Sequence, residues 1–500
     1  MAAPSTAFQA TGPFAFFDYF RVPYEVGSVE TGATGCVWPL PRGSRCLRWF
    51  SSNGPRRRGV HVGRFEVEGM ALAGSVVADS AVGRVLQADG DAHRWRAAEA
   101  VCGPDGGRLG SVWRHEDGSV LLPFDPGDVM ATLWSERYHA ADGSGLSVAA
   151  RRLAVRGYYL LRPALPRAVQ LRLRRAFARV QARATFPRWP VEDGLHDFYA
   201  WLFRVLEELA GRPVPWLDLW PDGRTWALVL THDVETEVGL RQRELLRGPE
   251  RALGLRSSWN LVAERYAVDD DIVHALAAEG CEIGVHGLRH DGKDLGSRRL
   301  LRRRLPAMRR AADRWGAVGF RSPATQRRWE WMPGMGFAYD TSFPDTDPYE
   351  PQPGGCCTIL PFFNDELVEL PITLPQDHTL FALLGQRDGL LWQDKARYIR
   401  DRGGMALVLT HPDYASDPAV ADAYRKLIGS VHTDPTLWHA LPREVAEWWR
   451  RRATSFLRRG PEGWRIDGPA TGEGRVRFGA PSGRCATTSA PRAPASATAT

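Results

Sequence analysis

Five short apolar runs after residue 226 each end in a cluster of polar residues. Each run is short enough to form a buried strand, and each is followed by residues that favour a turn or a helix. Parallel strands joined by helices present their carboxyl ends at one face, where such clusters would gather. The pattern therefore predicts a parallel β/α domain with one active-site face. The runs and their clusters cover residues 227–235, 281–290, 318–323, 367–371 and 406–413.

The chain of 500 residues is long enough for more than one domain. Strand and helix patterns alternate in the region of the five clusters, whereas the region before it has short alternating strands and many glycines. We expect a loose lead-in (1–15), a smaller β-rich α+β N-terminal domain of unknown role (16–160), an arginine-rich helical linker (161–221), the β/α barrel (222–450), a C-terminal extension (451–466) and a disordered low-complexity tail (467–500).

The net charge of +7 does not by itself indicate a nucleic-acid partner. Only three of the 65 basic residues are lysines, which is typical of a composition bias across a genome. No nucleic-acid recognition motif accompanies the charge. We therefore expect no nucleic acid among the partners.

The seven cysteines include no Cys-x-x-Cys pair, which argues against a disulfide framework or a thiolate zinc site. The N-terminus has no signal-peptide pattern. No apolar stretch approaches the roughly 20 residues of a membrane span. These observations predict a cytoplasmic protein without a transmembrane segment.

An arginine-rich stretch at residues 164–184 has the periodicity of an amphipathic helix. A helix of this kind can lie on an anionic membrane surface, so a weak peripheral membrane contact stays open. The alternative, which we prefer, is a surface or linker helix with a solvated arginine face.

His286 and His290 stand four residues apart, directly after the second apolar run. Two histidines at this spacing can reach one divalent metal if the chain coils after Gly287. A carboxylate from the first cluster, Asp233 or Glu235, supplies a third ligand. Three protein ligands leave room for water and substrate, as a catalytic metal requires.

Hydrolysis at such a metal also needs a general base and a general acid. The carboxylate of the first cluster that does not bind the metal suits the base. His411 suits the acid, and Arg321 can keep the base ionised by charge pairing. Taken singly, Arg321 could instead form a structural ion pair, and His411 could be a packed histidine at the edge of the core.

Taken in order, these clusters resemble the motifs of the polysaccharide deacetylase, or NodB-homology, superfamily, which includes carbohydrate esterase family 4. The resemblance covers residues 222–450, less than half of the chain. The set in this order is specific, although no single motif is. The matching stretches are Thr231-His-Asp233-Val-Glu235, His286-Gly-Leu-Arg-His290, Phe320-Arg321-Ser-Pro323, Tyr339-Asp340-Thr-Ser342 and Leu409-Thr-His411.

The resemblance implies a deformed (β/α)7–8 barrel with a divalent metal, most simply Zn²⁺. By the same analogy Asp233 is the general base, while Glu235, His286 and His290 hold the metal. Water activated by the metal would attack an N-acetyl carbonyl group. His411 would then protonate the departing amine.

The chain departs from the family pattern at positions that shape the site. Glu235 is one methylene longer than the usual aspartate, and Val234 separates it from Asp233. Ala324 replaces the tyrosine that usually follows Arg-x-Pro, and the resemblance gives its backbone N–H to the oxyanion. His232 is an extra candidate ligand, for which we expect a packing role behind the site.

Further polar residues are candidate substrate contacts. Glu369, at the end of the fourth run, could orient His411 or hold substrate, and Asp340 is its rival for orienting His411. Four more residues are plausible sugar contacts, although for each of them we prefer a turn or capping role: Gln376, Asp377, Asp413 and Tyr414.

The leading hypothesis is a metal-dependent deacetylase that acts on an N-acetylated sugar or glycan precursor. A hydrolase of a small linear or cyclic amide would use the same residues on the same barrel. A sugar-nucleotide transferase would use Asp233 and Glu235 as a metal–diphosphate motif and would not need the histidine pair. A non-catalytic glycan-binding module is the remaining alternative.

Overall fold

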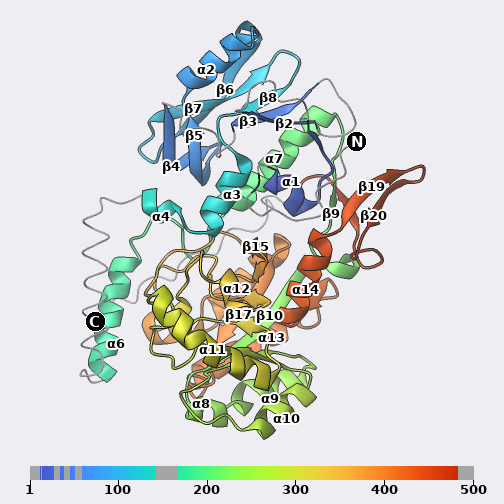
Figure 1. Cartoon of the computed structure of the whole chain (residues 1–500). Helices are drawn as coiled ribbons and strands as arrows, with labels where there is room; N and C mark the ends of the chain where they lie inside the picture. Colours follow the sequence, from blue (N-terminus) through green and yellow to red (C-terminus); the bar gives the residue numbers. More distant parts are fainter. Residues whose placement is uncertain are drawn as a thin grey trace. The chain divides into compact units, whose positions relative to one another are not determined.

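The computed structural model describes residues 12, 14–26, 34–38, 45–50, 59–141 and 167–481 (Figure 1). The chain forms two compact units. The first comprises Met1–Gly145, Asp193–Gly223 and Arg450–Arg484, and the second comprises Leu146–Glu192, Arg224–Trp449 and Cys485–Thr500. The stretch predicted as one linker, 161–221, is thus shared between the units.

The first unit is built on an eight-stranded sheet in the order β1-β2-β3-β8-β7-β6-β4-β5. Neighbouring strands are antiparallel except for β3 and β8. The strands are β1 (Glu25–Val26), β2 (Thr34–Trp38), β3 (Leu47–Phe50), β4 (Val60–Val67), β5 (Met70–Val77), β6 (Trp95–Cys102), β7 (Arg108–His115) and β8 (Val120–Leu122). The helical segments are α1 (Ala15–Phe20), α2 (Asp79–Ala88), η1 (Ala92–Arg94), α3 (Pro126–Trp134), α4 (Tyr138–Ala141), α7 (Gly194–Ala210) and η3 (Pro221–Gly223).

The turn between β4 and β5 shows how the sequence sets the register of this sheet. Glu68 and Gly69 both have positive φ angles, 51° and 75°, as a two-residue type I′ hairpin turn requires. The turn pairs Val67 with Met70 and keeps all eight residue pairs of the two strands in register. Helices α3 and α7 pack on β5.

The first unit also receives the end of the described chain. Strand β21 (Val476–Phe478) pairs with β9 (Pro215–Leu217), and β19 (Phe456–Gly460) forms a hairpin with β20 (Gly463–Asp467). The prediction of a disordered tail from residue 467 is therefore wrong as far as residue 481, because backbone pairing with β9 orders this segment. Residues 482–500 of that tail, and most of the predicted lead-in, lie outside the described residues.

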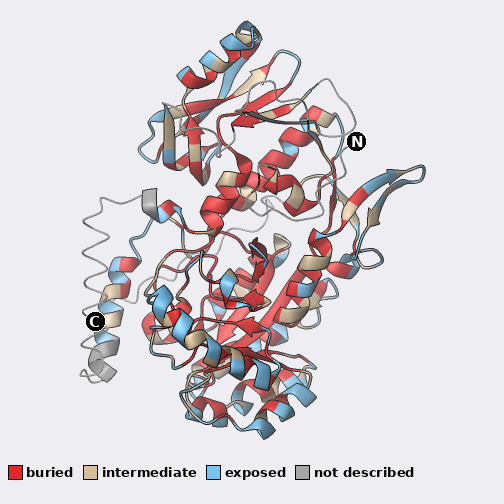
Figure 2. Cartoon of the chain, viewed as in Figure 1, coloured by how far each residue is buried: buried red, intermediate tan, exposed pale blue. Residues whose placement is uncertain are grey.

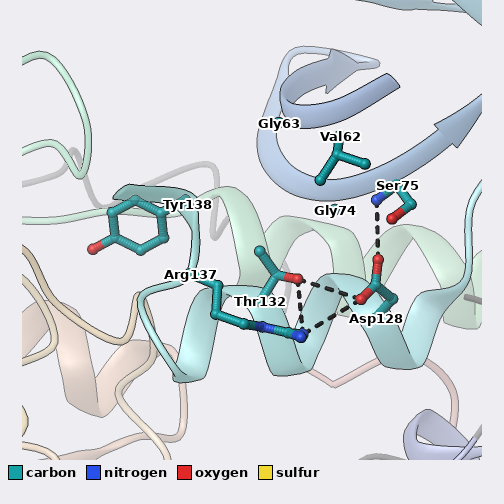
Figure 3. A pocket seen from close by; sticks show the side chains of 8 residues that line it. All are labelled: Val62, Gly63, Gly74, Ser75, Asp128, Thr132, Arg137 and Tyr138. Atoms are coloured by element: carbon teal, nitrogen blue, oxygen red, sulfur yellow. Dashed lines mark hydrogen bonds and ion pairs between the residues drawn. The ribbon is translucent and has the colours of Figure 1, made fainter. Parts of the chain in front are cut away.

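A cavity of about 460 Å³ lies in the first unit between the β4–β5 hairpin and the α3–α4 region (Figure 3). Asp128 accepts a hydrogen bond from the Ser75 backbone N–H at 3.0 Å and pairs with Arg137 at 3.4 Å. These polar groups of the wall bond to one another, so they fasten α3 to the hairpin. The cavity is lined by Val62, Gly63, Gly74, Ser75, Asp128, Thr132, Arg137 and Tyr138.

The second unit is built on a curled, mostly parallel sheet in the order β15-β16-β14-β13-β12-β11-β10-β17, with β18 also paired to β10. Only β15 and β16 are antiparallel neighbours. The strands are β10 (Trp226–Val234), β11 (Ser258–Leu261), β12 (Glu282–Val285), β13 (Gly319–Phe320), β14 (Tyr339–Asp340), β15 (Phe362–Asn364), β16 (Leu367–Glu369), β17 (Met405–Thr410) and β18 (Leu437–His439).

Helices separate most strands of this sheet, as the alternating sequence pattern predicts, whereas β14, β15 and β16 follow one another without a helix. The N–H of Leu374 donates to the carbonyl of Leu407, which joins the segment after β16 to β17. The helical segments are α6 (Arg167–Gln181), α8 (Glu237–Arg241), α9 (Glu244–Ala252), α10 (Asp270–Ala278), α11 (Arg298–Trp315), η4 (Pro323–Thr325), η5 (Pro333–Met335), η6 (His378–Leu383), α12 (Leu390–Asp401), α13 (Pro418–Val431) and α14 (Pro442–Ala453).

Strand β10 is the centre of the second unit. All nine of its residues are buried, because it pairs with β17 on one side and with β18 and then β11 on the other. Figure 2 shows buried residues along the strands and exposed residues on the outer helices α9 and α10. Among the described residues, no helix combines the length and the apolar character needed to cross a bilayer.

The loop that follows β14 buries several acidic side chains. Lys395 of α12 pairs with Asp345 at 2.7 Å. Burial nevertheless raises the pKa of Asp345 to about 6. Burial and the nearby charge of Glu350 raise the pKa of Asp347 to about 7. At a pH below these raised values, Asp345 and Asp347 therefore keep protons in the folded protein that they would release in the unfolded chain.

Because the folded-state pKa of Asp347 is raised, its destabilising effect is absent at low pH and grows as the pH rises toward 7. In the wild type the Tyr349 N–H donates to Oδ1 of Asp347 at 2.7 Å. The Asp347→Asn variant keeps an oxygen that can accept this hydrogen bond. We expect this variant to be more stable than the wild type by about 1 to 3 kcal/mol above pH 7, and by much less near pH 4. Urea unfolding at both pH values measures the difference; equal effects at both would contradict the assignment.

Candidate active site

The carboxyl end of β10 places alternate side chains on opposite faces of the sheet. Thr231 and Asp233 point to the face where Arg321 lies, since its Nη1 donates to both, at 2.8 and 3.0 Å. His232 points the other way and bonds to Glu250 and Thr410. Period-two alternation thus gives one strand two separate polar environments.

Three side chains form the one group with metal-ligand geometry among the described residues. The ligand atoms of Glu235, His286 and His290 all lie within 4.8 Å of one another. The buried Nε2 atoms of both histidines make no hydrogen bond. Nε2 of His290 lies 3.0 Å from Oε1 of Glu235. One carboxylate and two imidazoles are a donor set that suits Zn²⁺, so these residues fit the implied metal.

Backbone contacts set the orientation of two of these side chains. Nδ1 of His286 lies 3.1 Å from the carbonyl oxygen of Arg321. A carbonyl can only accept, so Nδ1 carries the proton and Nε2 presents its lone pair to the group. Asp413 accepts the backbone N–H of Glu235 at 3.1 Å and the hydroxyl of Thr236. Asp413, expected as a sugar contact, therefore fixes the chain that carries Glu235.

The histidine pair requires a coiled backbone after β12. Gly287 has a φ angle of +67°, and a side chain there would collide with Asp294 and Pro323. His290 also has a positive φ, 51°, an uncommon conformation for a residue with a side chain. The rings of His286 and His290 lie with their centres 5.0 Å apart. The expected coil after Gly287 is therefore present, and it brings the two rings together.

Asp233 is held as an ionised carboxylate. It accepts from Arg321 at 3.0 Å and from the Asn260 side chain at 2.8 Å, and it lies 3.6 Å from Nε2 of His286. Burial raises its pKa, but the charges of Arg321 and His411 and the hydrogen bond from Asn260 outweigh burial and lower the pKa overall. With two partners on Oδ1, Asp233 stands beside the metal-ligand group and outside it.

The histidines of the site differ in their charge. Burial lowers the pKa of His286 to about 4, so the ring is neutral at neutral pH, as a metal ligand must be. For His411, burial acts in the same direction, but Asp377 and the carboxylates of Glu235 and Asp233 outweigh it and raise the pKa to about 10. His411 is therefore a cation at neutral pH.

The partner of His411 differs from the prediction. Nδ1 of His411 donates to Oδ1 of Asp377 at 2.6 Å, and Oδ2 of Asp377 accepts the backbone N–H of His411 at 2.7 Å. The expectation that Glu369 or Asp340 orients His411 is wrong. The preferred capping role of Asp377 is confirmed, because its Oδ1 also accepts the backbone N–H of His378 at 2.7 Å at the start of η6. The segment that joins β16 to β17 carries Asp377 beneath the histidine.

Glu369 and Asp340 form a separate buried pair. They are register partners on β16 and β14. Burial and the neighbouring Asp340 raise the pKa of Glu369 well above its usual range. Asp340 accepts from the hydroxyl and backbone N–H of Ser342, whose Oγ in turn accepts the N–H of Ser322 in the turn after β13. The pair supports that turn and does not reach the metal-ligand group.

The other expected substrate contacts have different surroundings. Ala324 has a φ angle of 54° in the turn after Arg321. Gln376 donates to Oε1 of Glu350 at 2.6 Å. The ring of Tyr414 lies against that of His411, with centres 5.3 Å apart. Of these residues, Tyr414 is the one in direct contact with a predicted catalytic side chain.

Sequence reasoning missed Asn260 and Glu250. Asn260 follows Ser258 and Trp259 in a strand of four residues, too short and too polar to register as a sixth apolar run. The side-chain amide of Asn260, which binds Asp233, nevertheless lies near the end of a strand, as the residues of the five predicted clusters do. Glu250, on α9, accepts from His232 at 2.6 Å. The available sequence signal was that His232 lies on the opposite face of its strand from Asp233 and therefore needs a partner of its own.

Comparisons with known proteins give distant matches. No protein-family model and no curated protein matches the sequence. A Mycobacterium smegmatis structure described as a polysaccharide deacetylase matches 46% of this chain and 92% of its own, with 23% identity and a TM-score of 0.38. Puue allantoinase matches 53% and 98%, with 17% identity and a TM-score of 0.40. A Pseudomonas aeruginosa PAO1 structure, also described as a polysaccharide deacetylase, matches 47% and 94%, with 17% identity and a TM-score of 0.38.

The geometry distinguishes Asp233, near the end of β10, from Glu235, which directly follows the strand. We expect Glu235→Gln and His286→Ala to lose Co²⁺ or Zn²⁺ affinity by about 10- to 100-fold or more, because each removes a ligand. Asp233→Asn should bind the metal nearly as well as the wild type, since Asp233 bonds to Arg321 and Asn260. Titration calorimetry and the Co²⁺ absorption spectrum measure both. A larger loss in Asp233→Asn than in Glu235→Gln would reverse the assignment.

Proposed function

We propose that this protein is a metal-dependent hydrolase that removes the acetyl group from an N-acetylated sugar or glycan precursor. The observation that carries the proposal is the meeting of the metal-ligand group with two charged pairs, one built on Asp233 and one on His411. Such a set supplies a base, an acid and an electrophile in one place. The sequence resemblance to polysaccharide deacetylases supports the N-acetyl amide as the bond that is cleaved.

Glu235, His286 and His290 would hold the metal, and Zn²⁺ suits this donor set. When bound, such an ion lowers the pKa of water and polarises the carbonyl group of the substrate. Glu235 itself stays ionised: burial raises its pKa, but His290, His411 and His286 together lower it well below the usual range.

Asp233 acts as the general base in this proposal. Arg321 keeps the carboxylate ionised, and Asn260 fixes its rotation, so one oxygen remains to accept a proton from the attacking water. His411 acts as the general acid. Nδ1–H of His411 donates a hydrogen bond to Asp377. In the cationic ring the opposite nitrogen, Nε2, carries a second proton that it can give to the departing amine. This nitrogen lies 3.8 Å from Glu235, on the side of the metal-ligand group.

The turn after β13 would complete the site. We assign the backbone N–H of Ala324 to the oxyanion, because the turn follows Arg321 directly. The methyl side chain of Ala324 leaves more room than a larger residue would, which suits a bulky or substituted sugar. Tyr414, stacked edge-on against His411, would contact the sugar ring.

Acetate release tests the proposal. The protein loaded with Zn²⁺ or Co²⁺ should release acetate from at least one member of a panel of N-acetylated mono- and oligosaccharides, and Asp233→Asn should abolish it while keeping the metal. The panel also includes small linear and cyclic amides. Ammonia or acid released from these alone would favour the small-amide alternative. Metal binding without any turnover, together with glycan binding, would replace the enzyme with a binding module.

Asp377 provides a second test of the acid. In Asp377→Asn, His411 loses the charge that raises its pKa. We expect kcat to fall by about 10²- to 10⁴-fold, with metal affinity unchanged. The matched change Glu369→Gln should have a much smaller effect on kcat, because Glu369 pairs with Asp340 rather than with His411. Similar losses in both variants would indicate general damage to the sheet instead.

A further inference from the structure

Helix α6 of the second unit presents a row of arginines to solvent. Arg172, Arg179 and Arg183 are exposed, and their spacing places them on one face of the helix and its final turn. None of the three makes a hydrogen bond or ion pair with another described residue. The segment from 167 to 191 contains no acidic residue. The positive charge of this face is therefore not neutralised within the helix.

The opposite face of α6 is fixed to its own unit. Ala178 is buried in an apolar cluster with Tyr349 and Leu383. The side chain of Gln181 donates to the backbone carbonyl of Glu350 at 3.1 Å. The helix is thus attached to the loop after β14 and to η6, and its arginine row has a defined orientation on the unit.

The same attachment leads to the candidate active site. Glu350, whose backbone accepts from α6, accepts with its side chain from Gln376, the neighbour of Asp377. Burial raises the pKa of Glu350, while the charges of Arg174 and His411 both oppose that rise. Arg174 of α6 and His411 of the site therefore lie within electrostatic reach of one carboxylate. Arg174 lies on the attached face of α6 with Ala178 and Gln181, and the exposed arginines lie on the opposite face of the same helix.

We propose that α6 binds the anionic part of the glycan whose N-acetyl group the site hydrolyses. The substrate class is then an N-acetylated glycan that carries carboxylates or phosphates along its chain. Guanidinium groups recognise both anions through paired hydrogen bonds, and a row of them follows a charged polymer. The inference rests on the proposed deacetylase function and adds the charge of the substrate to it.

An anionic membrane is the other polyanion that a basic helix can meet. A helix that lies on a membrane buries its apolar face among the lipids. In α6 that face includes Ala178, which is buried against Tyr349 and Leu383. The exposed arginines alone would then give a membrane only electrostatic attraction, whereas a charged glycan needs no apolar contact to bind them. The structure thus favours the glycan.

The experiment compares two triple variants. The first carries Arg172→Gln, Arg179→Gln and Arg183→Gln. The matched control carries Arg302→Gln, Arg303→Gln and Arg310→Gln on α11, which are also exposed. The substrates are oligomers of equal length: neutral N-acetylglucosamine, N-acetylglucosamine alternating with glucuronate, and N-acetylglucosamine linked by phosphodiesters. KM, kcat and the salt dependence are measured with metal-loaded protein, and equilibrium binding is measured separately.

The α6 variant should raise KM and Kd for one or both anionic oligomers by roughly tenfold and flatten their salt dependence. It should leave kcat and the neutral oligomer unchanged. The variant with lysines at the three positions should regain only part of the affinity, because lysine restores the charge but not the paired hydrogen bonds. Comparing the glucuronate oligomer with the phosphodiester oligomer shows whether α6 recognises carboxylates or phosphates.

Equal effects of the α6 and α11 variants, or no effect of either, would overturn the inference. Binding of the wild type to phosphatidylglycerol-containing vesicles that is lost in the α6 variant, without any glycan effect, would assign the helix to a membrane instead. The equilibrium binding measurement tests the docking of the glycan on α6 separately from the proposed deacetylase reaction. If no oligomer is deacetylated but the anionic oligomers bind through α6, the proposed reaction fails while the docking surface stands.

Discussion

The buried guanidinium of Arg321 holds the candidate site together. Its Nη1 donates to Thr231 and Asp233, its Nε donates to Thr341 after β14, and its carbonyl fixes the ring of His286. One residue at the end of β13 thus connects this strand with β10, β12 and β14. Its charge keeps Asp233 ionised in a place where burial alone would protonate it. Removing the charge would leave an uncompensated buried carboxylate, so we expect substitutions of Arg321 to be strongly destabilising.

The sequence was informative wherever a local period determined the outcome. Strand ends, the coil after Gly287 and the alternation on β10 follow from spacing over a few residues, and they placed Glu235, His286 and His290 correctly as neighbours. The curled, mostly parallel sheet agrees with the predicted β/α arrangement. In each case the chain positions a residue through its immediate neighbours.

Pairings between distant segments were beyond a single sequence. Asp377 lies on an irregular segment between β16 and β17, and only the path of that segment brings it to His411. A carboxylate on any loop near the strand ends would have been an equal candidate. Helix α7, predicted as part of a linker, joins the first unit through its packing on β5. Linker and domain helices share the same amphipathic pattern, so periodicity could not separate them.

The discontinuous first unit has a consequence for how the protein is made. Strand β21 pairs with β9, and Arg452 donates to the backbone carbonyls of Tyr19 and Leu217. During synthesis Tyr19 and β9 leave the ribosome before the continuous stretch Arg224–Trp449 of the second unit, and Arg452 and β21 leave after it. The first unit can therefore complete its contacts only after that stretch has been made, although domains generally fold in order from the N-terminus during synthesis.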